Sequence, residues 1–302
     1  MTAPARRSTV IASLATLLLT ACQGTATSTP SPTAASTGAP TSASVSPSAS
    51  PRGLAACPPA RPLASLTALA RTDISPDDLL AMPDGTLWVT DPDSGHIEHL
   101  SSDGHVLTSI VDAQAPEGMV AVGGWIILAE QTPNRLVGFT PPNTARSAVL
   151  SLPPRGSAQG VDGIGFDSAS GLLLIPDSPH GTLLTATVDG TVVRTMATGL
   201  GRPVAAAAAP DGAIWVAVEG GRGLLRVPAA GGSATAVRGR DLTQLDDIIL
   251  AGSLLSATSL TTNPVVAIDP QTGADRVLVT GGHALQGLAI LSDGRLAVAD
   301  ST

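Results

Sequence analysis

The sequence predicts an all-β protein, a six-bladed β-propeller over residues 56–302, and three observations lead to this prediction. A similar stretch of about 42 residues recurs after residue 76, which is the mark of a repeat architecture. Within each copy, short apolar segments alternate with turn signals, as expected for antiparallel strands. No segment after the first copy begins shows the 3.6-residue periodicity of an amphipathic helix. Four short strands per copy make one propeller blade.

The copies are aligned by a residue that stands just before or within each opening apolar segment. These opening positions are Asp77, Glu117, Asp162, Val204, Asp246 and Gln286. They are 40, 45, 42, 42 and 40 residues apart, so the sequence predicts six blades.

The first copy shows the expected strands most clearly. The segment "LLAMP" leads to the turn Asp84-Gly85, and "TLWVT", "HIEHL" and "VLTSI" follow, separated by "DPDSG" and by Asp103-Gly104. Asp-Gly pairs favour the positive φ angles of tight hairpins. Trp88 and Trp215 occupy equivalent places in two copies, and we expect both to pack between neighbouring blades.

The last copy stops after its second strand, at "LAVADST". A propeller must cover its edge strands, and the segment Leu63–Arg71 precedes the first copy without a blade of its own. We therefore expect this N-terminal segment to form the outermost strand of blade six and to close the ring, which leaves that blade with three strands.

The first 55 residues indicate export and anchoring. Arg6 and Arg7 precede the apolar run Val10–Leu19, a pattern typical of a signal peptide at residues 1–21. Leu19-Thr20-Ala21-Cys22 resembles the bacterial lipobox, which implies a lipid on Cys22, a membrane anchor and an extracytoplasmic location. Residues 22–55, rich in Ser, Thr, Pro and Ala, read as a disordered tether. With Cys22 lipidated, Cys57 would have no partner for an intrachain disulfide.

The net charge is −8 and no basic patch is visible, which argues against nucleic acid as a partner. The stretch "DLLAMPDGTLWVTDPDSGHIEHLSSDG" resembles the NHL repeat, and residues 63–302 are similar to the senescence-marker/gluconolactonase family of six-bladed propellers. The resemblance implies one divalent cation at the channel mouth. It places Asp77 and Asp246 on two of the family's ligand positions, and Val204, which cannot coordinate, on a third.

The opening residues also suggest chemistry without the resemblance. Inner strands converge on the propeller axis, so Asp77, Glu117, Asp162 and Asp246 should crowd one channel mouth. Such a cluster requires a bound cation, raised pKa values or wider spacing. All-oxygen ligands favour Ca²⁺ or Mg²⁺, and the candidate ligands are Glu117, Asp162, Asp246 and Gln286. Asp77 or His283 is the candidate acid–base group. The alternative is capping and water-mediated bonding without an ion.

A second set of acids follows the second strand of most copies. Because these strands run back from the other face, we expect the set to lie opposite the first ring and to accept backbone N–H bonds. Its members are Asp91, Glu130, Asp177, Glu219 and Asp300.

Two functions remain open at this point. One is a non-catalytic membrane-anchored lipoprotein whose propeller binds a small molecule, glycan or protein at the channel mouth. The other is a divalent-metal-dependent hydrolase of the gluconolactonase type, a lactonase. A lyase related to streptogramin-inactivating propellers would be expected to have seven blades.

Overall fold

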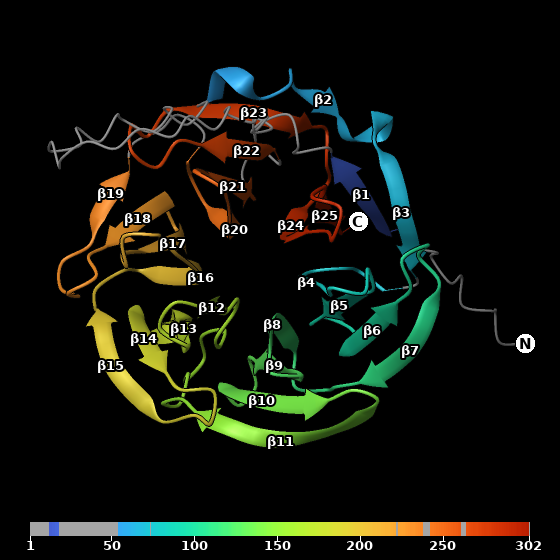
Figure 1. The fold of residues 1–302 in the computed structure, drawn as a ribbon. Helices are drawn as coiled ribbons and strands as arrows, with labels where there is room; N and C mark the ends of the chain where they lie inside the picture. Colours follow the sequence, from blue (N-terminus) through green and yellow to red (C-terminus); the bar gives the residue numbers. More distant parts are fainter. Residues whose placement is uncertain are drawn as a thin grey trace, which may run out of the picture.

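The computed structural model of the chain describes residues 12–17, 54–72, 74–221, 223–237, 242–260 and 264–301. The described residues form short strands and three single-turn 3-10 helices: Leu54–Ala56, Leu63–Ser65 and Ser178–His180. The strands build six sheets arranged around a central axis, and this is a β-propeller (Figure 1). The all-β prediction is therefore confirmed.

Five sheets are blades in the strict sense, because each contains four strands that follow one another in the chain. Blade one contains β4 (Leu79–Ala81), β5 (Leu87–Asp91), β6 (His96–Leu100) and β7 (Val106–Val111). Blade two contains β8 (Pro116–Val122), β9 (Trp125–Glu130), β10 (Arg135–Thr140) and β11 (Asn143–Ser151). Blade three contains β12 (Gly165–Asp167), β13 (Leu172–Asp177), β14 (Thr182–Ala186) and β15 (Val192–Ala197).

Blade four contains β16 (Arg202–Ala208), β17 (Ile214–Glu219), β18 (Gly223–Val227) and β19 (Thr235–Val237). Blade five contains β20 (Leu245–Ala251), β21 (Leu254–Ser259), β22 (Val265–Ile268) and β23 (Asp275–Thr280), and the short β2 (Arg61–Pro62) pairs with β23 in parallel. The observed strands of blade one match the segments that the first repeat predicted.

The structure thus shows five blades rather than the predicted six. The remaining sheet, here called the composite sheet, takes its strands from both ends of the chain. Its order is β24 (Leu285–Ile290), β25 (Leu296–Asp300), β1 (Ala12–Leu17) and β3 (Thr67–Thr72). The sixth copy of the repeat supplies only two strands, so it cannot build a blade from consecutive chain.

The closure of the ring also differs from the prediction. β3 takes the outermost position, as expected of Leu63–Arg71, but it does not pair with β25. The strand between them is β1, which pairs antiparallel with both: Ser13 to Leu17 lie opposite Asp300 to Leu296, and Ala12 lies opposite Thr72. Residues predicted to belong to the signal peptide therefore complete the composite sheet in the uncut chain.

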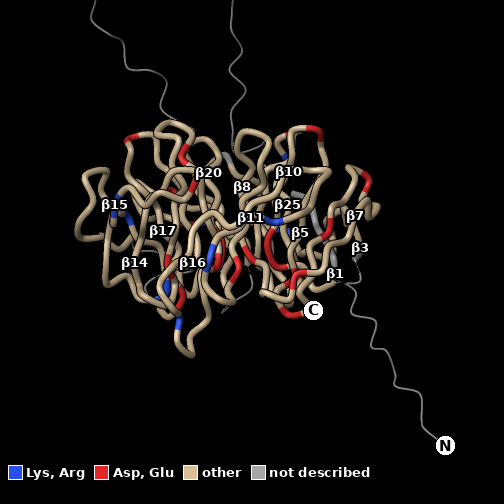
Figure 2. Tube along the Cα trace, turned by 90° about the horizontal axis from the view of Figure 1, so that it is seen from below, with Lys and Arg blue, Asp and Glu red and all other residues tan. Residues whose placement is uncertain are grey.

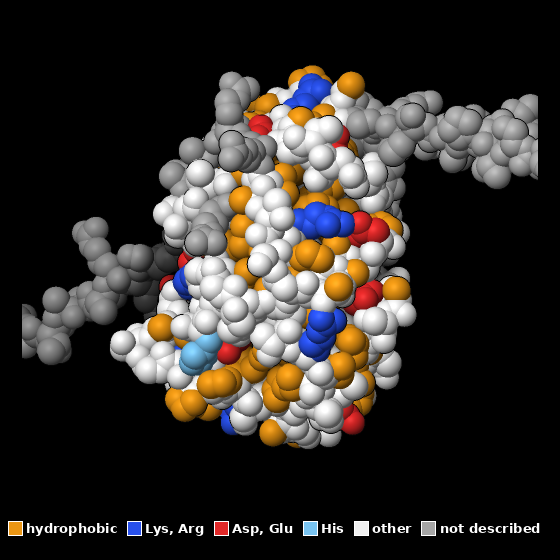
Figure 3. Space-filling model, turned by 90° about the vertical axis from the view of Figure 1, so that its left-hand side faces the viewer, with side chains coloured by type: hydrophobic (Ala, Val, Ile, Leu, Met, Phe, Trp, Pro, Cys, Tyr) orange, Lys and Arg blue, Asp and Glu red, His pale blue; other side chains and the backbone are white. Residues whose placement is uncertain are grey.

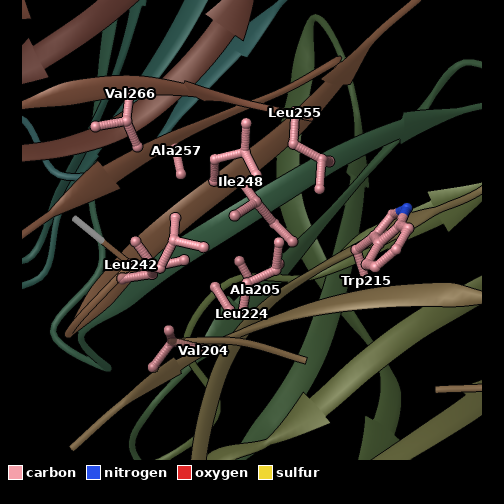
Figure 4. Packing of buried hydrophobic residues seen from close by; sticks show 12 residues of the cluster. Val204, Ala205, Trp215, Leu224, Leu242, Ile248, Leu255, Ala257 and Val266 are labelled. Atoms are coloured by element: carbon pink, nitrogen blue, oxygen red, sulfur yellow. The ribbon is translucent and has the colours of Figure 1, made fainter. Parts of the chain in front are cut away.

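The core lies between neighbouring sheets, because each radial sheet buries both of its faces. Between blades four and five, Val204, Trp215 and Leu224 pack against Ile248 and neighbouring aliphatic side chains (Figure 4). Between blades one and two, Trp88 is 2% exposed, stacks on His99 and meets Phe139 edge-on. Both tryptophans pack between blades, as predicted.

Most of the large apolar side chains that remain exposed among the described residues lie on outer strands, such as Leu107 on β7 and Val193 on β15, while Trp125 on β9 is also exposed. On the side shown in Figure 3, hydrophobic side chains are scattered among polar atoms. None of the helices in the described ranges is long and apolar enough to cross a membrane.

Cys57 is buried and disulfide-bonded, and this corrects the prediction that it has no partner. The sequence contains two cysteines. The other is Cys22, the predicted lipidation site, which lies outside the described residues together with most of the predicted signal peptide and nearly all of the tether. A cysteine that carries a thioether-linked lipid has no thiol left for a disulfide.

Candidate functional site: an acidic central channel

The inner strands of the six sheets surround the central axis. Each pairs with another strand on one side only, so its second backbone edge faces the channel (Figure 1). Six carboxylic acids lie at or near the starts of these strands and are here called the inner acids. They are Asp77, Asp78, Glu117, Asp162, Asp246 and Asp247.

Backbone irregularities accompany these side chains. The strand register shifts between Leu245 and Ile248 in blade five, across Asp246 and Asp247. The same shift occurs between Pro116 and Met119 around Glu117, and between Leu285 and Leu288 around Gln286. Successive side chains of a regular strand point to opposite faces, and a bulge re-aims them. The bulges therefore explain how two consecutive aspartates can belong to one cluster.

Glycines narrow the channel at the same level. Gly118 follows Glu117, and a Cβ atom there would lie 2.5 Å from the Cα of Gly163 in the next blade. Gly287 follows Gln286, and its Cβ would lie 2.5 Å from the carbonyl oxygen of Asp77. Its N–H donates to that same oxygen at 2.8 Å. Only glycine permits this approach of neighbouring inner strands, which forms a neck at the inner acids.

The side chains of Gln286 and Glu117 both contact Asp77 on one side of the neck. The Nε2 of Gln286 donates to the Oδ1 of Asp77, and the carboxyl group of Glu117 is close enough for a hydrogen bond between the two acids. Glu117 is 4% exposed, and its Oε2 has no donor among the described residues. Two carboxylates can share such a contact only with a proton or a cation between them.

Arg202 supplies a positive charge on the other side of the neck. Its Nη2 lies 2.7 Å from the Oδ2 of Asp162, and its Nη1 contacts Glu219. Val204, which occupies the opening position of blade four, is fully buried in the core (Figure 4). Blade four therefore contributes an arginine and a buried apolar side chain at the position where the other blades could offer a metal ligand.

Blades one and five present matching pairs of aspartates. The N–H of Asp78 donates to the Oγ1 of Thr90 at 3.2 Å, and the N–H of Asp247 donates to the Oγ1 of Thr258 at 3.0 Å. The Oδ2 of Asp247 also accepts the N–H of Leu288 from the composite sheet at 2.7 Å. No donor among the described residues contacts the carboxylate of Asp78.

All six inner acids have raised pKa values. Burial is the largest cause for each of them, and repulsion from the neighbouring carboxylates adds to it. The pKa of Asp162 rises to about 7 although Arg202 opposes the shift. The pKa of Asp247 also rises to about 7, opposed by the N–H groups of Leu288 and Ile248. The site therefore retains protons at neutral pH.

A cavity of about 670 Å³ begins at Asp78 and Asp247, here called its floor, and follows the inner strands to their far ends. Asp78 and Asp247 form its charged end. Its walls include Leu80, Val120, Phe166, Ile249 and Ile290, and its rim includes exposed residues of the turns after the inner strands, such as Ser168 and Pro210. This volume falls within the range of small-molecule sites.

The second set of acids, here called the outer acids, lies on the same face as the inner acids and not opposite them. Strand pairing places Glu130 beside Pro116, Glu219 beside Arg202, and Asp300 beside Leu285. The prediction was wrong because the second strand of a hairpin ends where the first begins. Figure 2 shows acidic positions both on the loops of the upper face and in the lower half, towards the C-terminus.

Asp91 and Asp300 accept backbone N–H groups, as predicted, whereas Glu130 and Glu219 contact arginines and Asp177 contacts the side chains of Asn134 and His180. Asp91 accepts the N–H groups of Ser75 and Ser94 at 2.9 and 3.0 Å. Asp300 accepts the N–H groups of His283 and Ala284 at 2.7 and 3.3 Å. The ring of His283 lies 3.4 Å from Asp300 and its side chain is 73% exposed. The structure thus connects His283 to an outer acid, and its predicted acid–base role stays a prediction.

The predicted metal ligands lie in one region, but their surroundings differ from those of a cation site. Asp162 already contacts Arg202, Gln286 directs its amide nitrogen to Asp77, and Val204 is apolar and buried. In the part of the chain that the structure describes, no three His, Cys, Asp or Glu side chains are grouped so that they could hold a metal ion. These residues do not fit the gluconolactonase-type ion, although Glu117 Oε2 is a buried acceptor that no donor in the described part of the chain contacts.

Sequence reasoning missed three parts of this site: Arg202, the second aspartates Asp78 and Asp247, and the neck glycines. The pairs Glu117-Gly118, Asp162-Gly163 and Gln286-Gly287 were the available signal. They place a glycine directly after an opening residue in half of the copies.

Solved structures of other β-propellers are similar to this structure, whereas sequence comparisons find no match. No protein-family model and no curated protein matches the sequence. A chain in the nidogen/laminin complex is 21% identical with a TM-score of 0.64, over 74% of this chain and 88% of that one. A streptogramin B lyase is 17% identical with a TM-score of 0.56, over 74% and 78%.

Regucalcin from Agrobacterium tumefaciens str. C58, a calcium-binding protein, is 14% identical with a TM-score of 0.58, over 72% of this chain and 78% of that one. The neighbours thus include NHL- and gluconolactonase-like propellers and virginiamycin B lyase propellers. At these identities the likeness shows the β-propeller fold and nothing finer.

Proposed function

We propose that this protein is an exported, membrane-anchored lipoprotein whose propeller binds a small-molecule ligand in its central cavity without catalysis. The cavity is the observation that carries the proposal: it has a volume of about 670 Å³, two of the inner acids, Asp78 and Asp247, line one end, and exposed turns border the other. Ligand pockets combine apolar walls with a few convergent polar groups. This cavity has both features.

A ligand screen against the full chain tests the binding proposal. Thermal-shift measurements with a library of small molecules should yield compounds that raise the melting temperature. The matched variant Ala207→Trp, which places a larger side chain on the half-buried wall, should abolish those shifts while it keeps the circular dichroism spectrum. Shifts that persist unchanged in Ala207→Trp would contradict binding in the cavity.

A hydrolase is the second candidate, and a specific observation favours it. Asp162 and Asp247 have pKa values of about 7 in one cluster, which suits acid–base catalysis near neutral pH. A lactone panel, assayed with and without Ca²⁺, Mg²⁺, Mn²⁺ or Zn²⁺, separates the two functions. Turnover that disappears in Asp246→Ala would establish the hydrolase and overturn the non-catalytic proposal.

The predicted divalent cation has its own test. Calorimetric titration of chelator-treated protein with Ca²⁺ should show about one ion per chain if Glu117, Asp162, Asp246 and Gln286 bind it. The double variant Asp162→Ala/Asp246→Ala should then lose the binding. The contact between Arg202 and Asp162 leads us to expect no stoichiometric binding.

The lipoprotein part of the proposal rests on the N-terminal sequence. A lipid anchor on Cys22 is incompatible with two features of the structure. A lipidated Cys22 has no thiol for a disulfide with Cys57, and cleavage before Cys22 removes residues 12–17, which form β1 in the composite sheet. Mass spectrometry of the protein from bacterial membranes should find a diacylated N-terminal Cys22 and no peptide from residues 12–17. A disulfide-bonded chain that still contains residues 12–17 would overturn the anchor.

A further inference from the structure

We infer that the cavity binds an organic cation, a protonated amine with an apolar body, whose ammonium group sits between Asp78 and Asp247. This inference rests on the proposed ligand-binding function and names the chemical class of the ligand. The two carboxylates come from blades one and five and form the floor of the cavity. A ligand that enters from the rim would meet them last.

The floor contains unused hydrogen-bond acceptors. Among the described residues, no donor reaches the carboxylate of Asp78, which repels the neighbouring carboxylate of Asp247. Glu117 lies near Asp78 but is not among the residues that line the cavity; it is 4% exposed, and its Oε2 lacks a donor within the described ranges. Arg202 brings positive charge to the inner acids, but its guanidinium group contacts Asp162 and Glu219 and not the floor. Acceptors without donors in a confined space favour a ligand that donates several hydrogen bonds and carries positive charge.

The walls indicate that the cation belongs to an organic molecule. Above the floor the cavity is lined by aliphatic and aromatic side chains such as Leu80, Phe166 and Ile249, over a volume far larger than one ion needs. The free edges of the inner strands add backbone N–H and C=O groups that can bond polar substituents. An ammonium group needs only acceptors at hydrogen-bond distance and not a full coordination sphere, so two carboxylates suffice.

The test compares three probes of equal chain length on the full chain at pH 8, above the raised pKa of Asp247: hexylammonium chloride, 1-hexanol and sodium hexanoate. Calorimetry or saturation-transfer NMR should show hexylammonium binding about tenfold more tightly than hexanol, and hexanoate not binding. Asp78→Asn and Asp247→Asn should each weaken hexylammonium by about tenfold and leave hexanol unchanged. Both substitutions keep the side-chain shape, and circular dichroism checks the fold.

Asp167→Asn is the matched control, because Asp167 lines the same cavity at the rim end of β12. It should leave hexylammonium binding unchanged, which would place the ammonium group at the floor. Equal binding of hexylammonium and hexanol, abolished by Ala207→Trp, would overturn the cation while the ligand-binding proposal stands. No binding of any probe would overturn the inference, and the library screen would then decide the proposed function separately.

Discussion

Two sets of acids lie on one face of this propeller, and they differ in what surrounds them. The outer acids end the second strands and accept N–H groups or contact arginines, as Asp91 and Glu130 illustrate. The inner acids begin the first strands and mostly face one another around the channel. The same residue type is therefore structural in one ring and a source of unfavourable charge in the other. Unfavourable charge that the fold retains is typical of a binding or catalytic site.

The largest effect should come from Arg202, which connects the two sets. Arg202→Met leaves Asp162 and Glu219 without their cation, and breaking such a buried pair costs about 3 kcal/mol in the free energy of unfolding. Urea unfolding at pH 8 measures the loss. The double variant Arg202→Met/Asp162→Asn should recover part of it, and equal losses in the single and double variants would show that Asp162 does not matter.

The pH dependence should show the inner acids directly. The pKa values of Asp162 and Asp247 rise from 3.8 to about 7 in the folded state, so the folded state binds more protons between those values. The free energy of unfolding must then fall as pH rises through this window, by about 2 kcal/mol after allowance for solvent screening. Urea unfolding at pH 5, 6, 7 and 8 tests the sign, and Asp162→Asn should flatten the profile. A stability that increases from pH 5 to pH 8 would contradict the cluster.

Removal of an outer acid should destabilise the protein. Asp91→Ala leaves the N–H groups of Ser75 and Ser94 without their acceptor, at a cost of about 2 kcal/mol. The variant Asp91→Asn keeps one acceptor oxygen and should lose less. Thermal unfolding at pH 7 ranks the three proteins. If Asp91→Ala were as stable as the wild type, the division between the two rings would fail.

The smallest effect has the opposite sign. Glu117→Gln removes a buried carboxyl group whose ionised form is disfavoured and offers an amide N–H to Asp77, so we expect a gain of about 1 kcal/mol at pH 8. Asp177→Asn is the matched outer control and should be destabilising, because Asp177 accepts the Nδ2 of Asn134. Chemical denaturation of both variants decides whether they move in opposite directions.

Much of the architecture could be predicted from the sequence. The repeat and its Asp-Gly turns predicted the all-β propeller, the strands of blade one and the inter-blade position of Trp88. The opening positions also predicted which acids start the inner strands. The blade count failed because the final copy holds only two strands, and no local pattern in residues 12–17 distinguishes an export signal from a strand of the composite sheet.

The sequence by itself therefore determined the repeat, the strands and the placement of acids, since all three depend on local patterns of turns and apolar residues. Tertiary structure decided what those acids meet. Strand bulges brought Asp246 and Asp247 into one cluster, and the neck glycines allowed the inner strands to approach closely. Arg202 reached Asp162 across 40 residues of sequence. Contacts across the channel depend on ring closure, a property of the whole chain that no single repeat contains.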